Sequence, residues 1–257
     1  MLARPVACVS SRGSFAPSWP SLVGEDLGWQ TTNLACSGAQ TKDMTASQDV
    51  DPNPDNPPQF NALDGNTRIV TLGIGGNDIG FVEIATKCAE LFLRNPTGTG
   101  SPCRDYYNSG GTDQIAARIA ALATRLRAVL DTIDARSPRA RVFTVGYPAI
   151  LPETTVNFEL CQPTLPVAKG DVAYLRDSVE KRLNDTIRYV AVAHGEAYVD
   201  TYTPSIGHDA CKPPTVRWVE PVVPGADAFP VHPNRSGMEA TARAVRATMR
   251  AHGVPVS

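Results

Sequence analysis

The hydrophobic residues of the chain follow two periods in alternation. Short aliphatic and β-branched runs are typical of strands buried on both faces. Four such runs occur, at residues 31–35, 68–72, 141–145 and 197–200. Apolar residues at three- and four-residue steps after Asp113 predict a long amphipathic helix, and residues 172–190 repeat the pattern. Because strands alternate with helices, we expect an α/β fold with a mostly parallel sheet and helices on both faces.

Two further helices are marked by their ends. Residues 19–28 predict a helix with Pro20 in its first turn and Gly28 at its end. A capping box at residues 236–239 predicts the start of a last helix, which extends to about Ala251.

Three stretches lack hydrophobic periodicity and are expected to be irregular. Residues 49–60 are rich in Pro, Asn and Asp, which is typical of a surface loop. Residues 88–111 and 203–234 are longer. Because long irregular segments often carry function, we expect residues 88–111 to line a pocket.

A glycine-rich turn follows the run at 68–72 and reads G-I-G-G-N-D-I-G-F at residues 73–81. Its glycines permit the tight turn that places Asn77 at the carboxyl end of a strand, where open α/β sheets bind ligands. A neutral amide there can donate a hydrogen bond to a developing oxyanion. The alternative interpretation is that Asn77 and Asp78 only cap the next helix.

Composition limits the class of protein. The chain has 257 residues, 42% of them hydrophobic, which is enough for one globular domain with a large core. Its 24 Lys and Arg are scattered and balanced by 26 Asp and Glu, which argues against a nucleic-acid partner. No apolar run has the length of a membrane span, so we expect no integral membrane segment.

Six cysteines indicate the compartment. They form no C-x-x-C pair and have no suitably spaced histidines, so we expect no metal site. An even number of separated cysteines favours disulfides and a secreted protein, and the alternative is six reduced thiols in a cytosolic one. The N-terminus has no apolar segment of the kind found in signal peptides. Either the chain is cytosolic or its true beginning is missing.

His232 is the candidate base. It stands just before the last predicted helix, and a neutral imidazole can take a proton from a serine hydroxyl. The alternative is a surface or capping role. Three segments in order, N-L-A-C-S-G-A-Q-T at 33–41, the turn at 73–81 and H-P-N-R-S-G at 232–237, resemble the SGNH (GDSL-type) hydrolases. The three cysteine pairs are similar to those of the secreted actinobacterial esterases and lipases of that superfamily.

The resemblance implies a fold and a set of roles. It implies a three-layer, flavodoxin-like sheet, with the Gly38 N–H and the Asn77 amide as oxyanion-hole donors and His232 as general base. In most of the family an Asp three residues before the His completes the triad. Phe229 stands there in this chain, and we expect its main-chain carbonyl to orient the imidazole instead. No cofactor is implied, and the substrate is a small-molecule or lipid ester.

The family's first block, a strand ending in Gly-Asp-Ser with the nucleophile, is not found in this sequence. We therefore expect residues 1–257 to be a single, N-terminally truncated SGNH hydrolase domain whose first strand is missing. In a competing alignment, Ser10 or Ser11 is the nucleophile. The alternative function is a non-catalytic, ligand-binding relative, and coding sequence upstream of Met1 would separate the two.

Sequential pairing of the cysteines places each pair beside one loop of the proposed site. We therefore expect the bridges Cys8–Cys36, Cys88–Cys103 and Cys161–Cys211. We also expect a monomer.

Overall fold

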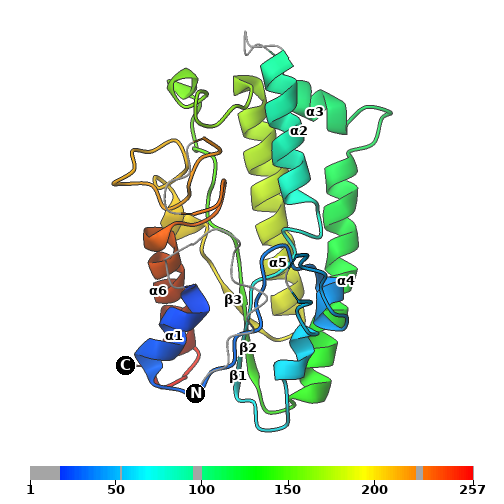
Figure 1. Ribbon diagram of the computed structural model, residues 1–257, viewed down its shortest axis with the longest axis vertical. Helices are drawn as coiled ribbons and strands as arrows, with labels where there is room; N and C mark the ends of the chain where they lie inside the picture. The colour runs from blue at the N-terminus through cyan, green and yellow to red at the C-terminus, as the bar shows by residue number, and fades with distance from the viewer. Residues whose placement is uncertain (1–17, 53, 95–99, 224–227, 257) are drawn as a thin grey trace.

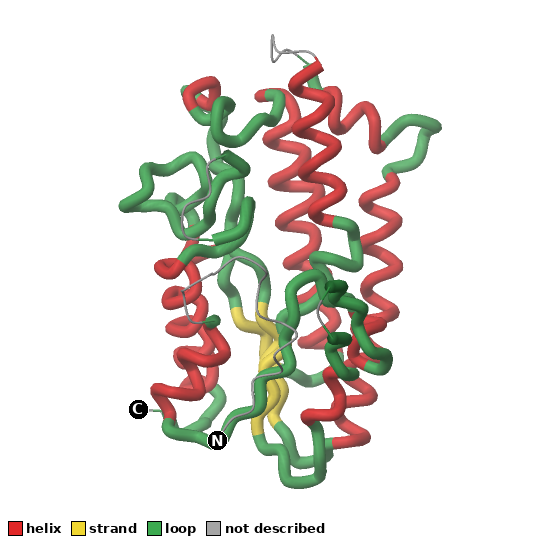
Figure 2. Tube along the Cα trace, viewed as in Figure 1, coloured by secondary structure: helices red, strands yellow, loops and turns green. Residues whose placement is uncertain are grey.

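The computed structural model describes residues 18–52, 54–94, 100–223 and 228–256. These residues form a parallel sheet between two layers of helices (Figures 1 and 2). The predicted α/β class is confirmed.

The sheet has three strands in the order β1-β2-β3, namely β1 (Ile69–Leu72), β2 (Arg141–Val145) and β3 (Ala197–Val199). Both pairs of neighbours run parallel. Apart from Arg141 at its start, the central strand β2 is buried throughout, whereas β1 has three half-buried residues and one buried residue. Within the described part of the chain, β1 therefore forms one edge of the sheet.

Helices cover both faces of the sheet (Figure 1). One layer contains α1 (Trp19–Leu27) and α6 (Arg235–Ala251), and α6 contacts β2 and β3. The other layer contains α2 (Phe81–Arg94), α3 (Pro102–Tyr107), α4 (Gln114–Arg136) and α5 (Arg182–Ala193). A π-helical segment, η6 (Tyr174–Lys181), leads into α5. The short 3₁₀ helices are η2 (Thr41–Met44), η3 (Gln59–Ala62), η4 (Phe158–Leu160), η5 (Lys169–Asp171) and η7 (Thr203–Ser205).

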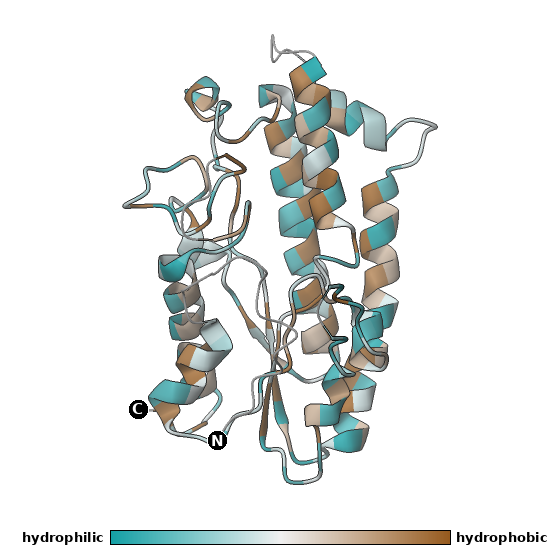
Figure 3. Cartoon of the chain, viewed as in Figure 1, coloured by the Kyte–Doolittle hydropathy of each residue, from teal (hydrophilic) through white to brown (hydrophobic). Residues whose placement is uncertain are grey.

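Helix α4 forms where its hydrophobic spacing predicts it. Asp113 is the N-cap, and its carboxylate accepts a hydrogen bond of 2.9 Å from the Ala116 N–H, which satisfies one free donor of the first turn. Hydrophobic and hydrophilic residues alternate along the helices (Figure 3). The apolar residues of the α4 spacing are all buried: Ile115, Ile119, Leu122, Leu126, Val129 and Ile133.

The N-cap of the last helix lies two residues before the predicted one. Asn234, not Ser236, is the N-cap of α6, and its side chain accepts a hydrogen bond of 3.1 Å from the Gly237 N–H. Asn234 has an extended backbone, as an N-cap requires, while Ser236 already lies inside the first turn.

The prediction that residues 88–111 are irregular is wrong at their beginning. Helix α2 extends to Arg94, and α3 follows within the same stretch. The buried face of α2 consists of Ile84, Cys88 and Phe92, which recur every four residues. Cys88 therefore belongs to the hydrophobic face of a helix. The helical period is not visible in a segment that starts at Cys88, because Ile84, the preceding residue of that face, lies outside it.

The strand predicted at residues 31–35 is also absent from the structure. These residues have no regular secondary structure, because a strand requires a paired neighbour and no described segment pairs with them. Side chains supply some of their hydrogen bonds instead: Asn56 Nδ2 donates to the Leu34 carbonyl at 3.2 Å, and the Ala35 N–H donates to Asn33 at 3.0 Å. The expectation that the family's first strand is missing stays a prediction, because residues 1–17 lie outside the described ones.

Two of the three expected disulfides are present. Cys88–Cys103 joins α2 to α3 with a Cα–Cα distance of 4.9 Å, and Cys161–Cys211 joins two loops with a distance of 5.2 Å. The expected Cys8–Cys36 bridge involves Cys8, which lies outside the described residues. None of the helices in the described ranges is long and apolar enough to cross a membrane.

Candidate active site

The segment containing Gly38 lies against the turn containing Asn77. The Asn77 side-chain amide donates to the Ala39 carbonyl at 3.1 Å, and Gln40 Nε2 donates to the Asn77 carbonyl at 3.3 Å. Gly38 has a φ of +79°, a backbone conformation that favours glycine, and the residue is exposed. The structure thus brings together two of the three motif segments.

Asp78 strengthens this junction. Its carboxylate accepts hydrogen bonds from Thr41, from the backbone N–H at 3.0 Å and from the side-chain hydroxyl. Arg125 Nε of α4 lies 3.3 Å from the same carboxylate, whose side chain is only 3% exposed. Asp78 therefore holds the Gly38 segment in place, which differs from the helix-cap role considered from the sequence.

The turn itself is fixed by Tyr147, which lies two residues after the end of β2. The Gly76 N–H donates to the Tyr147 hydroxyl at 2.9 Å, and a Cβ at position 76 would lie about 3.1 Å from the same hydroxyl. Burial raises the pKa of Tyr147 to about 12, so the hydroxyl stays neutral at physiological pH. A side chain at position 76 would therefore crowd the ring that holds the turn.

His232 lies at the end of a loop that folds back on itself. The Glu220 N–H donates to the His232 carbonyl at 3.0 Å, the Val231 N–H donates to the Glu220 carbonyl at 3.0 Å, and an antiparallel bridge joins Val219 to Pro233. Val231 has a φ of +56°, a strained conformation for a β-branched residue. The backbone next to His232 is therefore held in place by its surroundings.

The orienting partner of His232 differs from the predicted one. Its Nδ1 lies 2.8 Å from the carbonyl oxygen of Pro230, whereas the Phe229 carbonyl accepts a hydrogen bond from the His232 backbone N–H at 3.1 Å. The prediction named the wrong residue, because the local turn occupies the Phe229 carbonyl. A carbonyl only accepts hydrogen bonds, so this contact places the proton on Nδ1 and leaves the Nε2 lone pair free.

A buried ion pair supports the same loop. Arg217 contacts the carboxylate of Glu220, whose side chain is 2% exposed, with Nε at 3.1 Å from Oε1. Asn234, the N-cap of α6, donates from Nδ2 to the same oxygen at 3.0 Å. Nearby, the rings of His208 and Trp218 stack at a centroid distance of 4.0 Å. The sequence analysis did not single out the Arg217–Glu220 pair, although the three-residue spacing of opposite charges was available.

An apolar cavity links the two sides of the candidate site. Phe81, the last residue of the glycine turn, and Val231, the neighbour of His232, both line it. Glu180 also lines this cavity. Burial raises its pKa well above the ordinary glutamate range, and its Oε2 has no hydrogen-bond partner. Other lining residues come from α2, η6 and three loops, including Ile84, Ala85, Leu151, Leu165, Val179 and Val222.

Two parts of the predicted site stay predictions. The first is convergence of Gly38, Asn77 and His232 on one substrate carbonyl. The second is the nucleophile, since the alternatives Ser10 and Ser11 lie outside the described residues.

The fold and the candidate site together define an open-sheet α/β protein with a polar turn at the carboxyl end of a strand and an apolar cavity beside it. The sequence model of the GDSL-like Lipase/Acylhydrolase family matches residues 7–240. The chain belongs to this family.

Named relatives agree with this assignment. Lipase 2 of Streptomyces coelicolor is 39% identical over 221 residues, which cover 86% of this chain and 71% of that protein. The crystal structure of phospholipase A1 from Streptomyces albidoflavus NA297 superposes with a TM-score of 0.72 at 24% identity. The extracellular lipase from Streptomyces rimosus gives 0.64 at 24% identity. Each superposition covers 95% of this chain and 94% of the other, and both confirm the SGNH hydrolase fold.

Proposed function

We propose that the chain is the scaffold of a carboxylic ester hydrolase that acts by serine acylation. The observation that carries the proposal is the bond from Asn77 Nδ2 to the Ala39 carbonyl. It ties the Asn77 amide to the neighbour of Gly38, so that two oxyanion donors from distant parts of the chain lie at one junction. A side-chain amide has two N–H groups, and one remains to donate to an oxyanion.

His232 acts as the general base. Its Nδ1 contact with the Pro230 carbonyl leaves Nε2 free to accept a proton, and the side chain is exposed at the end of its loop. The serine oxygen attacks the ester carbonyl while Nε2 takes the serine proton. Gly38 and Asn77 stabilise the oxyanion, and Nε2 returns the proton to the leaving alcohol.

The apolar cavity receives the acyl group. Its lining includes Phe81, Ile84, Leu151 and Val222, which suit a hydrocarbon chain, and Val231 places it next to His232. We therefore propose small-molecule or lipid esters as substrates. The disulfides, together with the extracellular lipase of Streptomyces rimosus, support a secreted protein.

A second candidate function is binding without catalysis. It is favoured by the apolar cavity, whose lining can bind an acyl chain without any catalytic group. In this case the chain binds acyl esters but does not turn them over.

One assay separates these functions. We would measure hydrolysis of a short-chain nitrophenyl ester by the 257-residue chain and by a fusion in which the Gly-Asp-Ser block of a family relative precedes it. We expect no turnover by the chain alone and clear turnover by the fusion, lost on His232→Ala. His252→Ala is the matched control, because His252 ends α6 and its ring packs against Phe143 of β2.

The contrary outcomes are distinct. If the fusion folds and binds the ester saturably but does not hydrolyse it, the result favours the binding function. Turnover by the 257-residue chain that His232→Ala abolishes places the nucleophile within the chain, with Ser10 and Ser11 as the candidates.

A further inference from the structure

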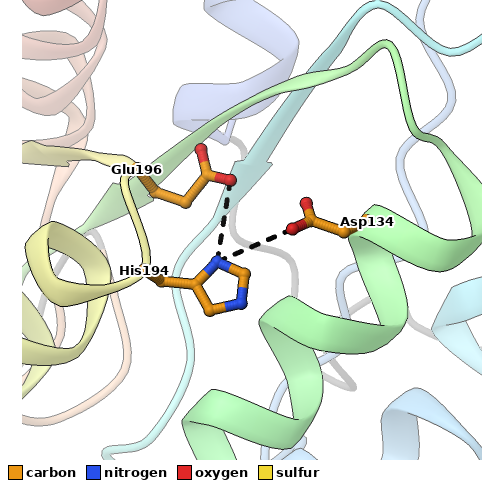
Figure 4. A group of neighbouring side chains, drawn as sticks. All are labelled: Asp134, His194 and Glu196. Carbon is orange, nitrogen blue, oxygen red and sulfur yellow. Dashed lines mark ion pairs between the residues drawn. The ribbon is translucent and has the colours of Figure 1, made fainter.

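Asp134, His194 and Glu196 form a cluster of three potential metal ligands (Figure 4). His194 ends α5, Glu196 immediately precedes β3, and Asp134 lies near the end of α4. The ligand atoms of these side chains all lie within 4.8 Å of one another. Because the cluster precedes β3, it lies at the amino ends of the parallel strands, whereas the glycine turn follows the carboxyl end of β1.

The hydrogen bonding of His194 fixes which nitrogen can bind a ligand. Its Nε2 lies 3.0 Å from a carboxylate oxygen of Asp131. An ionised carboxylate only accepts hydrogen bonds, so Nε2 carries the proton, and in the neutral ring Nδ1 keeps its lone pair. Metal-bound histidines have this arrangement, in which the outer carboxylate sets the tautomer and the orientation of the ring.

Nδ1 is buried and has no hydrogen-bond partner. It faces Asp134 Oδ2 at 3.8 Å and Glu196 Oε1 at 3.9 Å, distances beyond a hydrogen bond (Figure 4). A lone pair that faces two carboxylate oxygens in a largely buried position is repulsive unless a positive charge lies among them. The His194 and Glu196 side chains are 16% and 15% exposed, so bulk water screens this repulsion only in part.

We propose that this cluster binds a divalent cation of the zinc type through His194 Nδ1, Asp134 Oδ2 and Glu196 Oε1. One imidazole nitrogen and two carboxylate oxygens form a donor set suited to zinc. Two ligands with metal bonds of about 2.1 Å at tetrahedral or trigonal angles lie roughly 3.4 to 3.6 Å apart. The two separations from Nδ1, 3.8 Å and 3.9 Å, reach this range by shifts of a few tenths of an ångström, and the two carboxylate oxygens lie within 4.8 Å of each other. Asp134 is half exposed, which leaves a position for water.

The second carboxylate oxygen of Glu196 also has a fixed partner. Its Oε2 accepts a hydrogen bond of 3.2 Å from the Val142 N–H of β2, which holds Oε1 toward the histidine. A cation here joins α4, the end of α5 and the start of β3, so its role is structural. The spacing of cysteines and histidines in the sequence predicts no metal site, because Asp134 is far from His194 in the chain and the cluster contains no cysteine.

Zinc titration of the full chain tests this site. The protein is first treated with a chelator, and ZnCl2 binding is measured by calorimetry together with the thermal midpoint. We expect one saturable site and a zinc-dependent rise in the midpoint. His194→Gln should weaken zinc binding about 100-fold or more and abolish the rise, and Asp131→Asn, which removes only the outer carboxylate, should weaken binding by about tenfold. His252→Gln is the control and should bind zinc as the unmodified chain does.

Other results overturn the proposal. The first is that the chain shows no saturable zinc binding and that His194→Gln destabilises it to the same extent with and without zinc. The positive charge of the cluster would then be that of a protonated imidazole. The second is zinc binding that His194→Gln leaves unchanged. Should His194→Gln fail to fold, Asp134→Asn serves instead, because it removes one exposed ligand and leaves the imidazole in place, and unchanged zinc affinity in that variant also rejects the site.

Discussion

The two sides of the candidate site are held by different interactions. The oxyanion side, residues 38–41 and 73–81, consists of two segments joined by hydrogen bonds, and it follows β1, which pairs with one neighbour among the described strands. The histidine side, residues 200–223 and 228–234, contains a buried ion pair and an antiparallel bridge, and one disulfide joins it to the loop at Cys161.

This difference shows how each side depends on the rest of the protein. The histidine side is held by an ion pair and a bridge between its own residues and by one disulfide to the loop at Cys161, so changes to these few contacts should disturb it most. The oxyanion side is assembled from distant segments. Asp78 connects it to α4 through Arg125, and Tyr147, which lies just after β2, connects it to the sheet. Substitutions on the two sides should therefore separate loss of stability from loss of catalysis.

The largest expected effect is loss of the Cys161–Cys211 bridge on the histidine side. The bridge spans 50 residues, and replacing both cysteines by serine should lower the free energy of unfolding by about 4 kcal/mol through the greater freedom of the unfolded chain. Chemical denaturation of both proteins measures this change. The Cys88–Cys103 bridge, which spans 15 residues, is the matched comparison and should cost about 3 kcal/mol. A smaller cost for the longer bridge contradicts the account.

Glu220→Gln should have the next largest effect. It leaves the Arg217 guanidinium, only 11% exposed, without its carboxylate, and breaking a buried pair in this way costs about 3 kcal/mol. Denaturation with urea measures the loss, with exposed Glu25→Gln as the control. A cost equal to that of the control would show that the pair does not hold the histidine side.

Asp78→Asn should cost less stability and affect the oxyanion side. Arg125 is 45% exposed, so water compensates part of the lost ion pair, and we expect a loss of about 1 to 2 kcal/mol. In the fusion carrying Gly-Asp-Ser, the same substitution should lower kcat at least about tenfold, because the Gly38 segment loses its anchor. If the folded variant kept its kcat, Asp78 would not be needed to position Gly38.

The smallest effect concerns Glu180 beside the cavity between the two sides. Because burial raises its pKa in the folded state, the native protein keeps a proton that the unfolded chain releases above about pH 4.5. The stability that this group contributes is therefore full below that pH and is lost as the pH rises toward the raised value. Glu180→Gln should therefore gain thermal midpoint relative to the unmodified chain as the pH rises from about 5 to about 8. An equal difference between the two proteins at both pH values contradicts this prediction.

The sequence predicts the elements whose periods are local and complete. Helix α4 and strand β2 form at their predicted residues, because one hydrophobic face and one N-cap define the helix and an aliphatic run defines the strand. The segment at 31–35 does not form a strand, because pairing depends on a partner elsewhere in the chain.

The same limit applies to the site. The motifs identify Asn77 and His232, but the partner of His232 Nδ1 depends on the turn, which moves the contact from Phe229 to Pro230. The buried ion pair at Glu220 and the cluster at His194 require tertiary contacts that hydrophobic patterns do not contain.

The most direct test of the proposed ester hydrolase site is the kcat of Asn77→Ala in the fusion carrying Gly-Asp-Ser. An oxyanion donor acts in the transition state, so we expect kcat to fall by about 10²- to 10³-fold with little change in KM. Asp78→Asn is the comparison, since it loosens the same junction but keeps the Asn77 amide. An Asn77→Ala variant that remains folded and keeps its kcat, or that changes only KM, would contradict the assignment of Asn77 to the oxyanion hole.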